Sequence, residues 1–216
     1  MTKAKITKIK KFFSQFPVQK YTKGEIIFKP GDKFTHVYLN KSGFARAYTV
    51  TPKGESTINL FRPLFTFSVI HSISDHRNDY FFQALTPVEV YAAPASEFKK
   101  FLESDKELSF SVMEFFFGSL LNYFNNQGNI VNGNALNKVA SVLLQLTHDY
   151  GTVKNDKLIV NFPATHRVIA NIIGLTRETT SVQMSRLQKM NLISTKRSQF
   201  VVHSLDKLRE VSESSD

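Results

Sequence analysis

Cysteine and tryptophan are absent from this chain of 216 residues. Without cysteine there are no disulfide bonds, no thiolate catalysis, no zinc sites with thiolate ligands and no cysteine-held iron–sulfur clusters. Long hydrophobic runs are missing too, since no stretch approaches the roughly 18 apolar residues of a membrane span. The lysine-rich N-terminus lacks the apolar core and cleavage site of a secretion signal. We therefore expect a cytoplasmic protein, without membrane association, that folds without metal or disulfide bonds.

Catalytic motifs are equally scarce. The sequence holds no glycine-rich phosphate loop, no nucleophile elbow and no His/Asp/Glu cluster with metal-ligand spacing. We therefore expect no enzymatic activity, no metal and no cofactor. His71 and His76 could ligate a haem or a metal, but two histidines in a polar loop are more often solvated. Together with Arg62 and Arg77 they could instead hold an anion.

The net charge of +10 is concentrated at the two ends of the chain. Residues 1–23 hold seven lysines and no acid, residues 24–134 hold ten basic and eleven acidic residues, and residues 135–216 hold eleven basic and seven acidic residues. A basic excess of this kind suggests a polyanionic partner. The lysines of the N-terminal arm could equally serve to solvate the end of a helix.

The first half of the chain combines a short helix with β-strand patterns. Apolar residues from Ile6 to Phe16, spaced by three and four, predict an amphipathic helix that ends before Pro17. After Tyr21 the spacing changes to period two, with turn signals such as Pro30-Gly31-Asp32 between the segments. The expected strands include residues 25–28, 37–39, 45–48 and 88–91, and a short helix is expected at 96–101. Several short strands with regular turns predict a small antiparallel barrel or sandwich.

Residues 105–132 read as one long helix with apolar residues on more than one side. One side follows alternating steps of three and four, the spacing of a coiled-coil seam. This expected dimer interface consists of Met113, Phe116, Leu120, Tyr123, Gln127 and Ile130. A helix with two apolar faces can bury one on its own domain and the other on a second copy, which predicts a two-fold dimer. The alternative is a helix buried wholly within one chain.

Gly133-Asn134 interrupts the long helix and marks the expected domain boundary. A helix at 135–150 follows, with Gly151 in the role of its C-terminal cap, and then a strand at 157–162. Thr165 and Thr176 each stand where a hydroxyl can cap the first amides of a helix. Because Gly174-Leu175 separates the two helices, the segment matches a helix-turn-helix whose second helix enters a major groove.

On that second helix, Thr180, Met184 and Leu187 share one face and are expected to anchor it to the core. Arg177, Glu178 and Ser181 fall on another face as expected base readers, because Arg can donate to guanine, Glu can accept from cytosine and Ser is a short adaptable partner. Two strands at 192–196 and 200–203 are expected to form a basic β-hairpin wing. The expected contacts to the DNA backbone are Thr165, His166, Thr176, Thr179, Ser185, Lys196, Arg197 and Ser198. The alternative is a structural helical pair or a protein-binding winged helix.

The chain resembles the Crp/Fnr family of bacterial transcription regulators over nearly its full length. The most specific match is Thr176-Arg177-Glu178-Thr179, and a second is the barrel opening from Lys23-Gly24-Glu25 to Pro30-Gly31-Asp32, followed by Tyr38 and Ser42-Gly43. The resemblance implies a β-barrel sensor, a dimerising helix and a winged helix-turn-helix, with Arg177, Glu178 and Ser181 as base readers. The family commonly has an arginine after that serine, where this chain has Val182, so the operator sequence is left open.

Family members that bind cyclic AMP carry a Gly-Glu pair and later an Arg-Ser pair for the cyclic phosphate and the ribose. Residues 61–85 of this chain contain no glycine, and Tyr80-Phe81-Phe82 stands where Arg-Ser is expected. Tyr123 and Phe124 stand where small hydroxyl residues contact the nucleotide base in such relatives. Because arginine is the natural bidentate partner of phosphate, we expect a pocket filled by aromatic residues or shaped for an apolar molecule. The effector is not identified, and a chain that needs no ligand is an open alternative.

These patterns together predict an α+β protein. We expect an antiparallel β-barrel of the jelly-roll, cyclic-nucleotide-binding-like type over residues 1–104, a dimerisation helix over 105–132 and a winged helix-turn-helix over 133–216. The expected function is transcription regulation through a palindromic operator, bound as a homodimer and not controlled by cyclic AMP. RNA polymerase is a candidate partner beside double-stranded DNA and the second copy. The rival interpretation is a ligand-binding module that signals through protein contacts.

Overall fold

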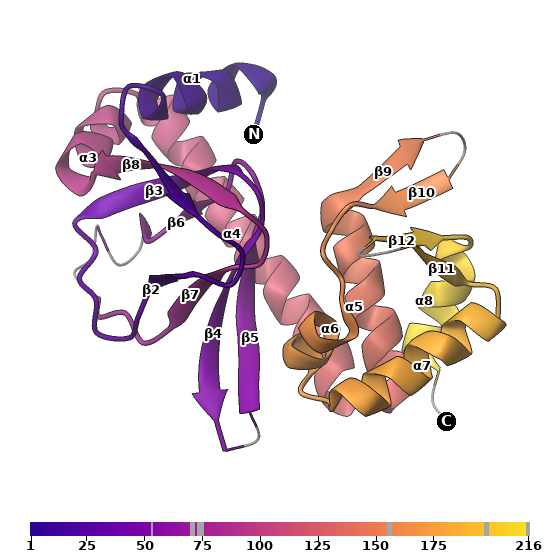
Figure 1. The fold of residues 1–216 in the computed structure, drawn as a ribbon. Helices are drawn as coiled ribbons and strands as arrows, with labels where there is room; N and C mark the ends of the chain where they lie inside the picture. Colours follow the sequence, from indigo (N-terminus) through magenta and orange to yellow (C-terminus); the bar gives the residue numbers. More distant parts are fainter. Residues whose placement is uncertain (53, 70–71, 73–75, 155–156, 197–198, 215–216) are drawn as a thin grey trace. The chain divides into compact units, whose positions relative to one another are not determined.

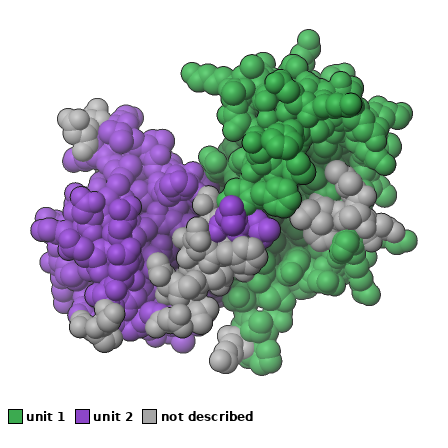
Figure 2. Space-filling view, turned by 180° about the vertical axis from the view of Figure 1, so that it is seen from behind, with its two compact units in different colours: residues 1–119 green, residues 120–216 purple. Residues whose placement is uncertain are grey.

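The computed structural model describes residues 1–52, 54–69, 72, 76–154, 157–196 and 199–214, with the side chains of residues 122–132 and 196 left out. It divides into two compact units, residues 1–119 and residues 120–216 (Figure 2). The division falls within the long helix α4 (Lys106–Asn132). Each unit has its own sheets and core, so each is described by itself. Among the described residues of both units, no helix combines the length and the apolar character that crossing a bilayer requires.

The first unit contains two four-stranded sheets in which every described pair of strands is antiparallel (Figure 1). One sheet has the order β1 (Val18–Tyr21), β8 (Val88–Pro94), β3 (His36–Ser42) and β6 (Thr66–Phe67). The other has the order β2 (Ile26–Phe28), β7 (Phe81–Ala84), β4 (Ala45–Thr51) and β5 (Gly54–Phe61). Helix α1 (Lys3–Phe13) precedes these strands, and α3 (Ala95–Glu103) and α4 follow them.

The two faces of β3 separate the core of this unit into two clusters. Tyr38 packs into the barrel interior, whereas its neighbours Val37 and Leu39 pack on the other side with Phe13 of α1 and Phe98 of α3. This alternation follows from the period of two in a β-strand. The predicted N-terminal helix is therefore confirmed, and its apolar face closes the outer side of the β3–β8 sheet. The fold class is confirmed as well.

The turn after β3 requires a glycine. Gly43 has a φ of +83°, and a Cβ added there would lie 2.0 Å from the carbonyl oxygen of Pro87. Asn40 supports the same turn by donating from Nδ2 to the carbonyl of Gly43 at 3.0 Å. The backbone at this point is close-packed and in the left-handed region, which an L side chain enters at a cost.

The second unit contains helices α5 (Ala135–Tyr150), α6 (His166–Ile173), α7 (Arg177–Lys189) and α8 (Leu205–Glu213). Its sheet has the order β11 (Ile193–Lys196), β12 (Gln199–Val202), β10 (Lys157–Val160) and β9 (Gly151–Lys154). The inward residues predicted for α5 are all buried, namely Val139, Val142, Leu143 and Leu146. The side chain of Asn137 joins the start of α5 to the end of α8, because Nδ2 donates to the carbonyls of Val211 at 2.7 Å and Ser214 at 3.0 Å.

Some details differ from the sequence-based expectations. Strands β1 and β9 were not expected, and both pair along their full lengths, β1 with β8 and β9 with β10. Gly151 ends α5, but its φ is −71°, so the residue is not in the left-handed conformation of a typical glycine cap. Glycine is needed there for space, since a Cβ would lie 2.3 Å from the carbonyl oxygen of Thr147.

Candidate nucleic-acid interface

Two capped helices and a glycine turn form the candidate DNA reader. The hydroxyl of Thr165 accepts from the amide of Val168 at 3.2 Å, and the hydroxyl of Thr176 accepts from the amide of Thr179 at 3.0 Å. Each bond satisfies one of the free amides at a helix start. Between the helices, Gly174 has a φ of +69° and ends α6 in the left-handed conformation. The caps and the turn predicted from the sequence are thus present in the structure.

Helix α7 is attached to its unit by one buried face. Thr180, Met184 and Leu187 are at most 1% exposed, and their spacing of four and three places them on one side of a helix. Leu175, in the turn, is half-buried. The opposite side of α7 therefore points to solvent, which leaves it available to a groove.

The outward side carries the expected base readers. Arg177 and Glu178 are exposed, and the closest approach between their charged groups is 4.0 Å. An exposed ion pair at this distance is weak, so both side chains can turn toward a ligand. Ser181 is half-buried. Ser185 is exposed, and its hydroxyl donates to the carbonyl of Ser181 at 3.0 Å.

The expected backbone contacts lie around the helix starts and the wing. Thr165 and Thr176 are exposed, and His166 and Thr179 are half-buried. Strands β11 and β12 form the expected hairpin, with Thr195 paired to Phe200. The side chain of Lys196, together with Arg197 and Ser198, lies outside the described residues.

Two features of this interface were missed in the sequence. Gln188 of α7 donates from Nε2 to the hydroxyl of Thr195 on β11 at 2.8 Å, which ties the wing to the recognition helix. Exposed basic side chains also stand beside the expected contacts, with Arg167 at the start of α6 and Arg186 and Lys189 in the last turns of α7. The basic excess in residues 135–216 was a sequence signal for these basic side chains. The Gln188 contact had no such signal, because it is visible only in the folded structure.

The residues of the expected dimer seam on α4 differ in exposure in the structure. Met113 and Leu120 are exposed, whereas Phe116 is half-buried and packs against the cluster around Phe13 and Phe98 of its own unit. Its neighbour Phe117 is 59% exposed. Among the described side chains of α4, the exposed large apolar residues are Phe110, Met113, Phe117, Leu120 and Leu121. The side chains of Tyr123, Gln127 and Ile130 lie outside the described residues.

Aromatic rings fill the interior of the barrel. Neighbouring ring centroids lie 4.6 to 6.0 Å apart in a cluster that consists of Phe28, Phe34, Tyr38, Phe61, Phe67 and Phe82. Burial in this cluster raises the pKa of Tyr38 to about 12, so its hydroxyl stays protonated. Of the residues that stand in place of Arg-Ser, Phe82 belongs to this interior and Phe81 stacks on Tyr48, with centroids 5.2 Å apart.

Three of the four other candidate sensor residues lie in the described part of the chain. His76 and Arg77 are exposed, and Arg62 lies over the ring of Phe65 at 4.8 Å. His71 and the side chain of Phe124 lie outside the described residues. In the part of the chain that the structure describes, no three His, Asp or Glu side chains gather as a metal site.

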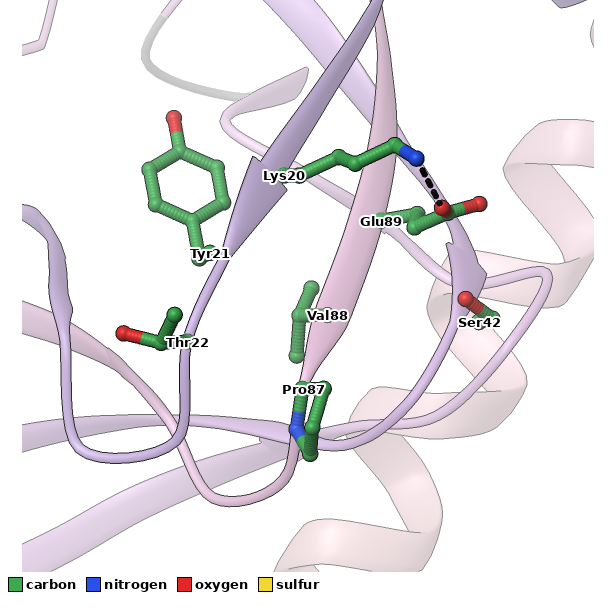
Figure 3. A pocket seen from close by; sticks show the side chains of 7 residues that line it. All are labelled: Lys20, Tyr21, Thr22, Ser42, Pro87, Val88 and Glu89. Atoms are coloured by element: carbon green, nitrogen blue, oxygen red, sulfur yellow. Dashed lines mark ion pairs between the residues drawn. The ribbon is translucent and has the colours of Figure 1, made fainter.

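A shallow depression of about 380 Å³ lies where β1 ends and β8 begins, next to Ser42 at the end of β3. Lys20 and Glu89 point toward one another across it (Figure 3), with Nζ and Oε1 3.2 Å apart, and Lys41 donates to the other oxygen of Glu89 at 2.8 Å. These two lysines hold the pKa of Glu89 below its usual range. The charges of this depression are thus already paired with one another, and we assign no ligand to it.

The barrel, the long helix and the capped helix-turn-helix with its wing define a DNA-binding regulator. Two family models match the chain in the same order, the cyclic nucleotide-binding domain over residues 18–105 and the Crp-like helix-turn-helix domain over residues 137–211. The chain belongs to the Crp/Fnr family of transcription regulators.

Its relatives include nitrogen and anaerobic regulators. The global nitrogen regulator of Synechocystis sp. is 28% identical over 189 residues, which cover 86% of this chain and 84% of that protein. The fumarate and nitrate reduction regulatory protein of Yersinia pestis is 27% identical over 180 residues, which cover 83% of this chain and 71% of that protein.

Solved structures share the fold. FixK2 from Bradyrhizobium japonicum superimposes with a TM-score of 0.78 at 19% identity, covering 93% of this chain and 99% of that one. A CooA mutant from Carboxydothermus hydrogenoformans gives a TM-score of 0.76 at 22% identity, covering 93% and 89%. At these identities the likeness establishes the fold alone, over 93% of this chain.

Proposed function

We propose that this chain is a cytoplasmic, homodimeric regulator that binds a palindromic operator without cyclic AMP and catalyses no reaction. The observation that carries the proposal is the outward side of α7. This side is polar and charged around Arg177 and Glu178, while the opposite face is held in the core by Met184 and Leu187. A helix anchored on one side and charged on the other suits insertion into a major groove.

The base readers in this proposal are Arg177, Glu178 and Ser181. Arginine can donate bidentately to guanine, and glutamate can accept from the amino group of cytosine. Glu178 is informative because an exposed carboxylate facing a polyanion is repelled, unless a base edge compensates for the repulsion. Contacts to the phosphates are assigned to Thr165, His166, Thr176, Thr179, Ser185, Lys196, Arg197 and Ser198. RNA polymerase is proposed as a further partner of the bound regulator.

The proposed dimer forms along α4, in the segment 105–132 between a sensor at 1–104 and the DNA reader at 133–216. Its support is the row of exposed apolar side chains at Phe110, Met113, Phe117 and Leu120. These positions follow steps of three and four, as in a coiled coil. A patch of this kind on one helix is complementary to itself across a two-fold axis, which is the commonest arrangement in homodimers.

Independence of cyclic AMP is supported by the barrel interior. A cyclic nucleotide needs space for its base and ribose and a cation for its phosphate. The interior is instead occupied by packed rings such as Phe61, Phe67 and Phe82. In the place expected for Arg-Ser, Phe82 is buried among those rings and Phe81 stacks on Tyr48.

The test is to select a duplex from a random pool with the full-length protein and to measure its affinity by fluorescence anisotropy. We expect a palindromic site with half-sites about one helical turn apart. Titration of cyclic AMP should change the affinity by less than about tenfold, which corresponds to about 1.4 kcal/mol of coupling. A scrambled duplex of equal composition is the control. Equal affinity for both duplexes would contradict the proposal and favour a module that signals through protein contacts.

A further inference from the structure

Val182 stands out on the outward side of the recognition helix. It lies four residues after Glu178 and three before Ser185, so the three share one face of α7. Its side chain is 63% exposed. Helix α7 is described over its full length, and every other exposed residue in it is polar or charged.

The stability of the unit does not explain a valine at this position. The buried face of the helix is supplied by Thr180, Met184 and Leu187, and Val182 points away from it. Valine is also a poorer helix former than the lysine, arginine or glutamine found at neighbouring exposed positions, because its branched side chain loses rotamers in a helix. A single exposed valine on an ordinary surface needs no explanation. On the surface that meets base edges, it has a specific chemical counterpart.

That counterpart is the C5-methyl group of thymine, the apolar feature that distinguishes the edges of base pairs in the major groove. We infer that Val182 reads a thymine methyl group in each half-site of the operator. The inference rests on the proposed function. It specifies one base of the operator, whereas the proposed function leaves that base undefined.

The position of the thymine follows from the helix. Four residues along α7 correspond to about 6 Å at the rise of an α-helix. Successive base pairs are about 3.4 Å apart. The thymine should therefore lie within one or two base pairs of the pair that Glu178 contacts. Polar readers are suited to donors and acceptors, so Val182 adds a contact that they cannot make.

The experiment removes only the methyl group. In the selected operator, each thymine is replaced in turn by deoxyuridine, symmetrically in both half-sites, and the affinity of the full-length protein is measured by competition anisotropy. Val182→Ala shortens the proposed reader without adding a polar group. Met190→Ala is the matched control, because it shortens another exposed apolar side chain, 45% exposed, at the C-terminal cap of the same helix, eight residues after Val182.

For the wild type, one deoxyuridine substitution should weaken binding about fourfold per half-site and about 15-fold for the pair, the value of one buried methyl group. The same substitution should have a clearly smaller effect on Val182→Ala, whose side chain is shorter, and its full effect on Met190→Ala. The inference is wrong if the wild type tolerates every deoxyuridine, if the sensitive thymine is as sensitive in Val182→Ala, or if no thymine lies in that range. A selection that yields no sequence preference would instead contradict the proposed function itself.

Discussion

Two adjacent phenylalanines of α4 provide a test of the proposed dimer interface, because only one of them is exposed. Phe117 is 59% exposed, whereas Phe116 packs within its own unit. A phenylalanine can bury about 200 Å², so about 120 Å² of Phe117 is available to a second copy. At about 25 cal/mol per Å² this contributes about 3 kcal/mol per copy and about 6 kcal/mol for the symmetric pair, as an upper bound. Phe117→Glu should then raise the dimer dissociation constant by up to about 10⁴-fold.

The assay is sedimentation velocity over a concentration series, combined with thermal unfolding. We expect Phe117→Glu to be monomeric at micromolar concentration with an unchanged barrel, because the side chain has no role in the core of its own unit. Phe116→Glu should lower the unfolding temperature, because it places a charge against the buried cluster that contains Phe13 and Phe98. Val153→Glu, at a 77% exposed valine of β9, is the control and should remain dimeric. The reasoning is refuted if the wild type is a monomer, or if Phe117→Glu dimerises as well as the wild type.

Three further predictions concern the operator, acid and the barrel turn. Glu178→Ala should relax the preference at one base pair per half-site by roughly 1–3 kcal/mol while non-specific binding holds or improves. Competition binding against single-base operator variants measures this preference. If the affinity ranking of the variants is unchanged, Glu178 does not read a base. Hydrogen bonds from Lys8 and from the amide of Leu108 hold the pKa of Asp105 below its ordinary 3.8, so its contribution to α1 docking is complete above that value and is lost as the pH falls through the lowered pKa. NMR shifts of the α1 amides should therefore change only below about pH 4, and Asp105→Asn should give the loosened state at every pH. Gly43→Ala should lower the free energy of unfolding in urea by about 2–4 kcal/mol, because it adds a steric clash to a strained φ. Gly24→Ala is the control, with a φ of +88° and no atom within 4 Å of an added Cβ, and it should destabilise the protein clearly less. Equal losses of stability would contradict the role of the clash.

The DNA reader was predictable because its signals are local. A threonine before each helix, a glycine between the helices and the spacing of Met184 and Leu187 all act within a few residues, and all four appear in the structure as expected. The contact between Gln188 and Thr195 was not predictable, because it depends on how the wing folds back onto the helix.

The register of α4 could not be read from its sequence. The spacing of Met113, Phe116 and Leu120 fits a seam, but the spacing of Met113, Phe117 and Leu120 fits one equally well. Only the barrel distinguishes them, because it places Phe116 against a cluster of its own unit. Strand β1 was missed for a similar reason. Three of its four residues are exposed, so it lacks the alternating pattern of a half-buried strand.

The pairing of β1 with β8 has a consequence for how the protein is made. Val18 lies opposite Tyr91. During synthesis, β1 therefore cannot pair until β8, about 70 residues further along the chain, has left the ribosome. At about 5 to 20 residues per second, this delay is roughly 4 to 14 seconds. The phenylalanines of the barrel interior, Phe28 and Phe34 among them, stay uncovered during that time. Nascent chains should therefore depend on chaperones, and synthesis at low temperature and low expression level should increase the yield of folded protein.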